Sequence, residues 1–400
     1  MNDSEALERH RAARLPRSLV IPSLNGIRAI SVLIVLLSHS GFGAIVPGGL
    51  GVTIFFFLSG YLITTLLMVE LATRSKIDIP QFYLRRAYRL LPPLVVTLAV
   101  AYGLVFARIM PCDFSFFALA SQLFYLANYY GLFFDPGNTT TPPGTGILWS
   151  LAVEEHFYIF FPLLLSLLLR DPARPRALAA VLMVLCLAAL IWRIYLVHSG
   201  VSEGRTYYSS DTRMDSIAYG CLLALVANPM ASLPFRDRMS WWQWLILILA
   251  SAVLVATLLD RNPAFRETFR YSIQGISLLP IFYFAIKFAK NSLFRHANTP
   301  WIAKLGVYSY FIYLIHFVII QVLIAYAGPL SNPFLLFAVA LVLSVGYAAM
   351  IDRFVDPYFR ELRRRSHKAS IGAGEDPNRI RKGPEMADRR EVGAQGDIVM

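Results

Sequence analysis

Long apolar stretches recur along almost the whole chain, and they constrain its fold more than any other feature. Eleven stretches can be drawn, at residues 24–44, 49–69, 90–108, 113–132, 147–169, 177–197, 212–228, 241–259, 269–289, 303–326 and 333–353. Most approach the roughly 20 residues that an α-helix needs to cross a bilayer. Only 16% of the residues are charged, against about a quarter in a soluble domain. The sequence therefore predicts an all-α, polytopic bundle of transmembrane helices.

Basic residues predict which ends of the helices face the cytoplasm. The N-terminal arginines and the basic run at 360–365 would both be cytoplasmic, so the number of spans must be even. The stretch 113–132 is the best candidate for a segment that does not cross, because it contains Gln122 and Asn128. We therefore predict about ten spans plus one re-entrant or peripheral apolar segment. Only the loop around Arg261 departs from the resulting charge pattern.

The remaining composition predicts the organisation outside the spans. Residues 1–20 form a basic cytoplasmic N-terminus without a cleavable signal, 21–358 a membrane domain, and 359–400 a cytoplasmic, disordered tail. The net charge of +12 comes mainly from loops between apolar stretches, which argues against a nucleic-acid partner. Three dispersed cysteines are too few for a disulfide framework.

The first apolar stretch carries two ionisable residues, Arg28 and His39. Ionisable side chains inside a membrane are costly and mark candidate functional sites. In a regular α-helix, eleven residues turn through only about 20° more than three full turns and rise by about 16 Å. Arg28 and His39 would then lie on one face, with the imidazole deeper in the membrane than the guanidinium.

Six motifs occur in a characteristic order along the chain. They are Leu24–Arg28 followed by His39, Pro47–Tyr61, Phe82–Pro92, Trp149–Tyr158, Asp211–Gly220 and Ser309–His316. Together they resemble the membrane acyltransferase-3 family of bacterial integral-membrane O-acyltransferases, from about residue 20 to about residue 355. Two features depart from the family's pattern. His156 stands where the family usually has Gln, and the esterase-like domain that some members append is missing.

The resemblance implies a reaction and a location. An acyl group, commonly acetyl, would pass from cytoplasmic acyl-CoA, a co-substrate, to a hydroxyl of a polysaccharide, lipopolysaccharide or glycolipid. The protein would lie among the lipids of the bacterial inner membrane, with both termini cytoplasmic and no bound cofactor. Two alternatives remain open: acylation of a small molecule such as a macrolide, and a transporter or flippase whose buried charges line a path.

His39 is the first candidate for catalysis, because acyl transfer to a hydroxyl needs a base and imidazole is the usual one near neutral pH. It could instead take the acyl group itself, or be a core histidine without a chemical role. His316 is the second imidazole candidate, and a hydrogen bond between helices explains it equally well. Glu154 could orient His39 or bind an acceptor hydroxyl, and we favour it over Glu155 because adjacent residues cannot face one pocket.

Arginines near the expected cytoplasmic face are candidates for binding the donor. Arg85, Arg86 and Arg89 could bind CoA phosphates, with Arg28 contacting the donor or ordering the site. The competing explanations are the ordinary basic loop that positive-inside topology produces, and a snorkelling arginine.

The other candidate binding residues have equally plain packing explanations. Ser59 and Gly60 would allow either a narrow channel for the pantetheine arm or close helix packing. Trp149 could stack on a sugar ring or anchor the helix at the interface. Arg213 and Asp215 would form an ion pair with each other. No metal site is expected, because His39, His156 and His316 lie on separate segments.

Overall fold

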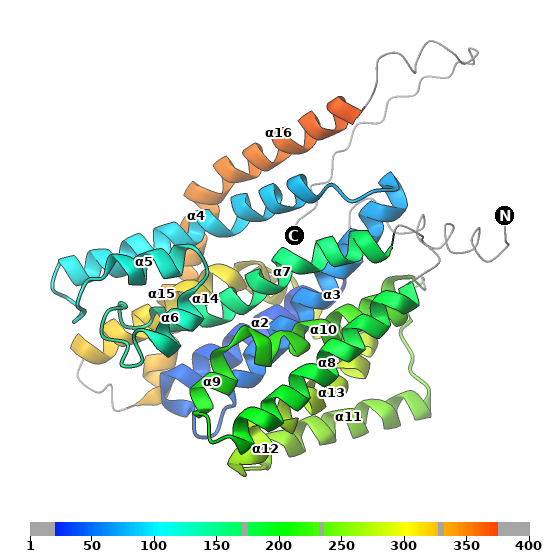
Figure 1. The fold of residues 1–400 in the computed structure, drawn as a ribbon, viewed down its shortest axis with the longest axis horizontal. Coiled ribbons are helices and arrows are strands. Elements are labelled where there is room, and N and C mark those ends of the chain that lie inside the picture. The colour runs from blue at the N-terminus through cyan, green and yellow to red at the C-terminus, as the bar shows by residue number, and fades with distance from the viewer. Residues whose placement is uncertain (1–20, 170–174, 232–235, 327–331, 375–400) are drawn as a thin grey trace.

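A computed structural model describes residues 21–169, 175–231, 236–326 and 332–374. Within these ranges the regular elements are all helices, without any strand. Ten helical segments there are long and apolar enough to cross a membrane. The predicted all-α bundle and its count of about ten spans are therefore confirmed (Figure 1).

The ten candidate spans follow one another along the chain with short connections, except for residues 107–144 between the third and the fourth. They are α2 (Leu24–Leu37) with η1 (Ser38–Phe42), α3 (Gly48–Arg74), α4 (Ile79–Phe106), η2 (Thr145–Leu148) with α7 (Trp149–Leu168), α8 (Pro175–His198), α9 (Glu203–Tyr208) with α10 (Ser210–Val226) and η3 (Pro229–Ala231), α11 (Trp241–Leu259), α13 (Phe269–Lys287), α14 (Pro300–Tyr326), and α15 (Pro333–Met350) with η5 (Ile351–Val355) and the start of α16 (Asp356–Gly374). Four shorter helices complete the described chain: α5 (Phe116–Leu123), α6 (Ala127–Phe133), α12 (Pro263–Glu267) and η4 (Arg295–Asn298).

The apolar stretch 113–132 is broken into α5 and α6, neither of which is among the candidate spans. The break lies at Tyr125, whose φ of 57° is left-handed and cannot continue a right-handed helix. The polar residues of this stretch are turned into the bundle. Gln122 Nε2 donates to Thr145 Oγ1 at 2.8 Å, and Asn128 Nδ2 donates to Ser210 Oγ at 3.1 Å. These hydrogen bonds explain why polar side chains are tolerated in this apolar stretch.

The centre of the bundle is the contact between α3 and α10, which lie side by side in Figure 1. Two glycines bring their backbones together. A Cβ on Gly60 would lie 2.0 Å from Ile217 O, and one on Gly220 would lie 1.9 Å from Phe57 O. Both distances are far below van der Waals contact, so any larger residue would push the helices apart. Gly60 therefore allows close packing of α3 against α10, which is one of the two roles considered for it. The other, a narrow channel for the pantetheine arm, stays a prediction.

The first span is kinked directly after His39, where Ser40 and Gly41 leave the helical conformation. Regular α-helix ends at Leu37, and Ser38–Phe42 forms a π-helical turn in which Gly41 has a φ of 101°. Such turns are rare and frequently occur at functional sites. The departures from helical φ/ψ in this turn, at Ser40 and Gly41, come after His39, and the shared face of Arg28 and His39 stays a prediction.

The C-terminal side of the last span is also helical. Helix α16 begins at Asp356, whose carboxylate pairs with Arg360 at 2.5 Å and with Arg363 at 3.3 Å. Residues 359–374 are therefore helical, whereas the sequence predicts disorder for this part of the tail. The predicted N-terminal region 1–20 and residues 375–400 lie outside the described residues.

Candidate active site

His39 and His316 form a hydrogen-bonded pair across 277 residues of sequence. His39 Nδ1 lies 3.0 Å from His316 Nε2. The two rings stack with centroids 5.2 Å apart, and Phe317 stacks on His39 with centroids 4.3 Å apart. His316 is fully buried, whereas His39 is partly exposed. Of the two imidazoles, His39 is the one that a substrate can reach.

The backbone carbonyl of Tyr313 fixes the placement of protons on this pair. His316 Nδ1 lies 2.8 Å from Tyr313 O, and a carbonyl oxygen only accepts, so Nδ1 carries a hydrogen. A buried position in a membrane span favours the neutral ring, whose other nitrogen, Nε2, is then an acceptor. His39 Nδ1 therefore donates to His316 Nε2. The lone pair of a neutral His39 is left on Nε2, where it can accept a proton.

A small polar cavity lies between α2, α3, α7 and α14, with a volume of about 60 Å³. Its lining residues are Arg28, Val52, Phe55, Phe56, Ser59, Ser150, Leu151, Glu154, Ser309, Tyr310 and Tyr313. Ser59 Oγ donates to Glu154 Oε1 at 3.1 Å. Arg28 Nε has no hydrogen-bond partner among the described residues. A space of this size holds a few water molecules and is too small for an acyl carrier.

Tyr313 joins this cavity to the histidine pair. Its hydroxyl lines the cavity and lies 2.7 Å from Ser150 Oγ, while its carbonyl accepts from His316. Helix α14 carries Tyr310, Tyr313 and His316 at intervals of three residues, which places them on one face. Polar groups therefore continue from Arg28, through the cavity, to His39.

The structure does not place Glu154 in contact with His39, as direct orientation of the imidazole would require. Its two oxygens contact Ser59, at 3.1 Å, and Arg86, at 3.9 Å. The ring of His39 instead contacts His316 and Phe317. Glu154 lines the cavity, and its other predicted role, binding of an acceptor hydroxyl, stays a prediction.

The three arginines of α4 differ in their partners. Arg85 pairs with Glu70 at 3.0 Å. Arg86 binds both carboxylate oxygens of Glu155, the closest at 2.6 Å, and its guanidinium lies over the Tyr158 ring. Arg89 makes no ion pair or hydrogen bond with any residue in the described part of the chain. Glu155 and Arg86 therefore hold α7 to α4, and Arg89 keeps its donors free.

The predicted ion pair between Arg213 and Asp215 is wrong. Asp215 Oδ2 lies 2.7 Å from Arg193 NH2, and both side chains are fully buried. Residues two apart on a helix point in different directions, and Arg213 instead donates to Tyr207 O and Thr53 Oγ1. Arg193 is missed by the sequence reasoning, although a lone arginine in an apolar stretch is itself a signal.

Two further residues of the α7 motif lie in packing contacts. Trp149 is only 7% exposed and packs against the rings of Phe56, Tyr207 and Tyr208. This position is buried, so Trp149 in this conformation offers no open face to a sugar ring. His156 Nδ1 lies 2.6 Å from Ser210 Oγ and its ring stacks on that of Tyr129. It thereby connects α7 to α10.

Acidic, cysteine and histidine side chains are dispersed. In the described ranges no three of them come together in a group that could hold a metal ion. The expectation of a metal-free site stays a prediction. The groups that do converge are two imidazoles, a carboxylate and unpaired guanidinium groups, which suit acid–base chemistry and anion binding.

Comparison with known proteins agrees with this chemistry. A family model described as an acyltransferase domain, that of the acyltransferase-3 family, matches residues 21–353. O-acetyltransferase OatA of Staphylococcus aureus is 29% identical over 365 residues, which are 90% of this chain and 60% of that protein. Peptidoglycan O-acetyltransferase OatA of Listeria monocytogenes is 35% identical over 223 residues, 54% of this chain and 35% of that protein. This chain thus spans about 60%, or less, of the length of these relatives. No solved structure matches it significantly.

The family match includes both histidines, the cavity and the three arginines of α4, and it ends between α15 and α16. It therefore covers most of the chain and every part of the site described above. With ten candidate spans in the described residues, the protein is a multi-pass membrane protein. This chain belongs to the acyltransferase-3 family.

Proposed function

We propose that the protein transfers an acetyl group from acyl-CoA to a hydroxyl of a cell-envelope glycan, with His39 as the general base. The observation that carries this proposal is the free lone pair on His39 Nε2, at the partly exposed end of the histidine pair. The names of the relatives, O-acetyltransferase and peptidoglycan O-acetyltransferase, support acetyl as the group and a glycan as the acceptor.

The proposed reaction begins when His39 Nε2 takes the proton of the acceptor hydroxyl. The hydroxyl oxygen attacks the thioester carbonyl carbon, and an oxyanion forms. Its collapse breaks the C–S bond, and the sulfur leaves with the proton that His39 returns. The products are an ester and free CoA thiol. During the step the imidazolium keeps its Nδ1 hydrogen bond to His316, which holds the ring in position.

The donor would approach from the opposite end of the polar path. Arg28 and Arg89 have donors free to meet anionic groups of CoA, and Arg28 lines the cavity that leads toward Tyr313. This arrangement fits a protein of the bacterial inner membrane with both termini and the α4 arginines on the cytoplasmic side, where acyl-CoA is found.

The experiment measures free thiol released from acetyl-CoA by the purified protein with envelope glycan as acceptor. We expect His39→Ala to lower the rate by about a hundredfold or more, the usual contribution of a general base. His296→Ala is the matched control, since His296 is exposed and precedes α14, which rises by about 24 Å between Pro300 and His316. Equal release by the wild type and His39→Ala would refute the proposal. A burst of thiol without acceptor would replace the general-base step by an acyl-histidine intermediate.

A further inference from the structure

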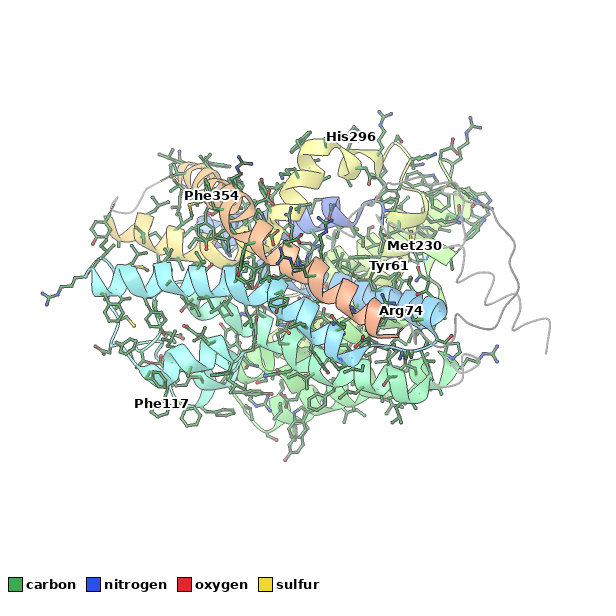
Figure 2. All side chains as sticks on the ribbon, turned by 90° about the horizontal axis from the view of Figure 1, so that it is seen from above. Tyr61, Arg74, Phe117, Met230, His296 and Phe354 are labelled. Carbon is green, nitrogen blue, oxygen red and sulfur yellow. The ribbon has the colours of Figure 1, made fainter. Side chains whose placement is uncertain are left out.

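Helix α16 lies outside the family match, which ends at residue 353, yet it packs along α4. Figure 1 places the two helices side by side, and Figure 2, turned by 90°, shows α16 crossing α4. The face of α16 toward the bundle carries Asp356 and Arg363, with Arg363 only 21% exposed. Arg365 points outward and is 74% exposed. One basic side chain of α16 is therefore turned toward the arginines of α4.

Ion pairs fix the position of Arg363. Its NH2 lies 3.3 Å from Asp356 Oδ1, about two turns earlier on the same helix. Asp356 also binds Arg360, which reaches back to Asp352 at 2.6 Å. Because Asp356 is shared between two arginines, its single negative charge does not neutralise both. Arg363 therefore keeps donors and charge for another anion.

Arg89, unlike Arg85 and Arg86 on the same helix, has no ion-pair or hydrogen-bond partner among the described residues. It lies within electrostatic reach of Arg28, Arg86 and Arg363, all of which repel it. Arg86 is neutralised by Glu155, but no carboxylate in the described residues pairs with Arg89. Like charges gathered in a partly buried site are costly unless an anion separates them. An anion between α4 and α16 would remove this repulsion.

We propose that Arg363 and Arg89 together bind a phosphate group of the acyl-CoA donor, so that α16 completes the donor site. This inference rests on the proposed function, because that function supplies the donor. CoA carries phosphates at one end and its thioester at the other. The guanidinium fork matches phosphate oxygens, and two forks from two helices would hold one group from both sides.

The test compares Arg363→Gln with Arg363→Lys and with Arg365→Gln, in the full chain. The donors are acetyl-CoA and acetyl-pantetheine, which lacks every phosphate. We expect Arg363→Gln to raise KM for acetyl-CoA about tenfold, because one charge-assisted hydrogen bond to the donor is lost. The kcat of this variant should stay within about twofold of that of the wild type. Arg363→Lys restores part of the affinity. Acetyl-pantetheine should not distinguish Arg363→Gln from the wild type, and Arg365→Gln should behave as the wild type with both donors.

A lipid headgroup offers the same phosphate chemistry, so each variant is measured in nanodiscs of phosphatidylcholine alone and with phosphatidylglycerol. An effect of Arg363→Gln that persists without anionic lipid and is confined to acetyl-CoA supports the donor site. An effect that needs phosphatidylglycerol and is equal for both donors assigns Arg363 to lipid and overturns the proposal, as does no effect at all.

Failure of the proposed function has a different signature. In that case the wild type would release no thiol from either donor. The site is then judged by binding alone, from the rise in melting temperature that free CoA causes. Stabilisation of the wild type and Arg365→Gln, but not of Arg363→Gln, supports the anion site, and equal stabilisation of all three refutes it.

Discussion

In the proposed function, the histidine pair would be an uncharged way to hold the general base His39 inside a membrane. In serine proteases a carboxylate fixes the tautomer of the catalytic histidine. Here a second imidazole, whose own proton is held by Tyr313 O, takes that place without bringing a negative charge into the lipid-embedded bundle. In the proposed reaction His316 would therefore be a positioning residue, which acts through His39 and does not itself contact the substrate.

This role predicts different outcomes for two substitutions of His316. His316→Phe removes the acceptor for His39 Nδ1, so kcat should fall by about ten- to a hundredfold while KM for donor and acceptor stays within about twofold. His316→Gln keeps an oxygen near the position of Nε2 and should retain more activity. Steady-state kinetics with both substrates checks this. Equal losses in the two variants, or losses carried by KM, would contradict the positioning role.

The sequence identifies the candidate site residues better than it identifies the residues that they contact. His39, Arg28 and Glu154 stand out because each is ionisable within an apolar stretch. The partner of His39 lies 277 residues away, and the partner of Asp215 is Arg193, on another helix. Helix periodicity tells which residues share a face, but not which two helices meet. Pairings across the bundle therefore require the packed structure.

Among the helices, the α3–α10 contact makes a prediction about stability. Gly60→Ala places a methyl group 2.0 Å from Ile217 O, a backbone atom that cannot turn aside. We expect a loss of about 2 kcal/mol or more in the free energy of unfolding, from overpacking. Gly103→Ala on α4 is the matched control, because its methyl group meets nothing within 4 Å. It should be neutral or stabilising by up to about 1 kcal/mol, from helix propensity.

Thermal melting of the purified variants in one detergent measures both effects. If Gly60→Ala melted at the same temperature as Gly103→Ala, α3 and α10 could move apart without loss of stability. In that case the reciprocal glycines would not be what fixes their approach.

The loop after α6 makes a prediction about pH. Burial alone would raise the pKa of Asp135, but hydrogen bonds from the amides and hydroxyls of Thr139 and Thr140 outweigh it, and the pKa is lowered. A carboxyl whose pKa is lower in the folded state stabilises the fold above its unfolded value, near 4. This contribution is lost as the pH falls through the folded value.

We therefore expect Asp135→Asn to cost about 1–3 kcal/mol in the free energy of unfolding near pH 7, because the charge-assisted bonds are lost. Below about pH 4 the difference from the wild type should shrink. Melting temperatures measured across this pH range check it, with Asp113→Asn as the control, since Asp113 binds Thr139 O through its backbone amide and its side chain has no hydrogen bond or ion pair with the described residues. A difference that is constant with pH would contradict the role of the ionised carboxylate.

For the whole molecule, the sequence predicts the spans well because the apolar length that crosses a bilayer is a local property. The start of α2 at Leu24 and the end of α14 at Tyr326 agree with the predicted stretches. The π turn at His39 and the helical continuation at Asp356 are not predicted. Both depend on contacts with distant parts of the bundle: His39 with His316, and α16 with α4.

The topology depends on whether 113–132 crosses the membrane, which reporter fusions can test. Helix α5 has 8 residues and α6 has 7. At 1.5 Å per residue each is only about 12 Å long or less, well short of a hydrocarbon core of about 30 Å. A reporter at Asn138 should therefore be extracytoplasmic and one at Pro172, outside the described residues, cytoplasmic. Fusions at Ser75 and Gly43, which both precede the segment, serve as references. Ser75 gives the signal of a cytoplasmic reporter and Gly43 that of an extracytoplasmic one. Reversal at Asn138 and Pro172 alone would make 113–132 a true span, bring the total to eleven and place the two termini on opposite sides.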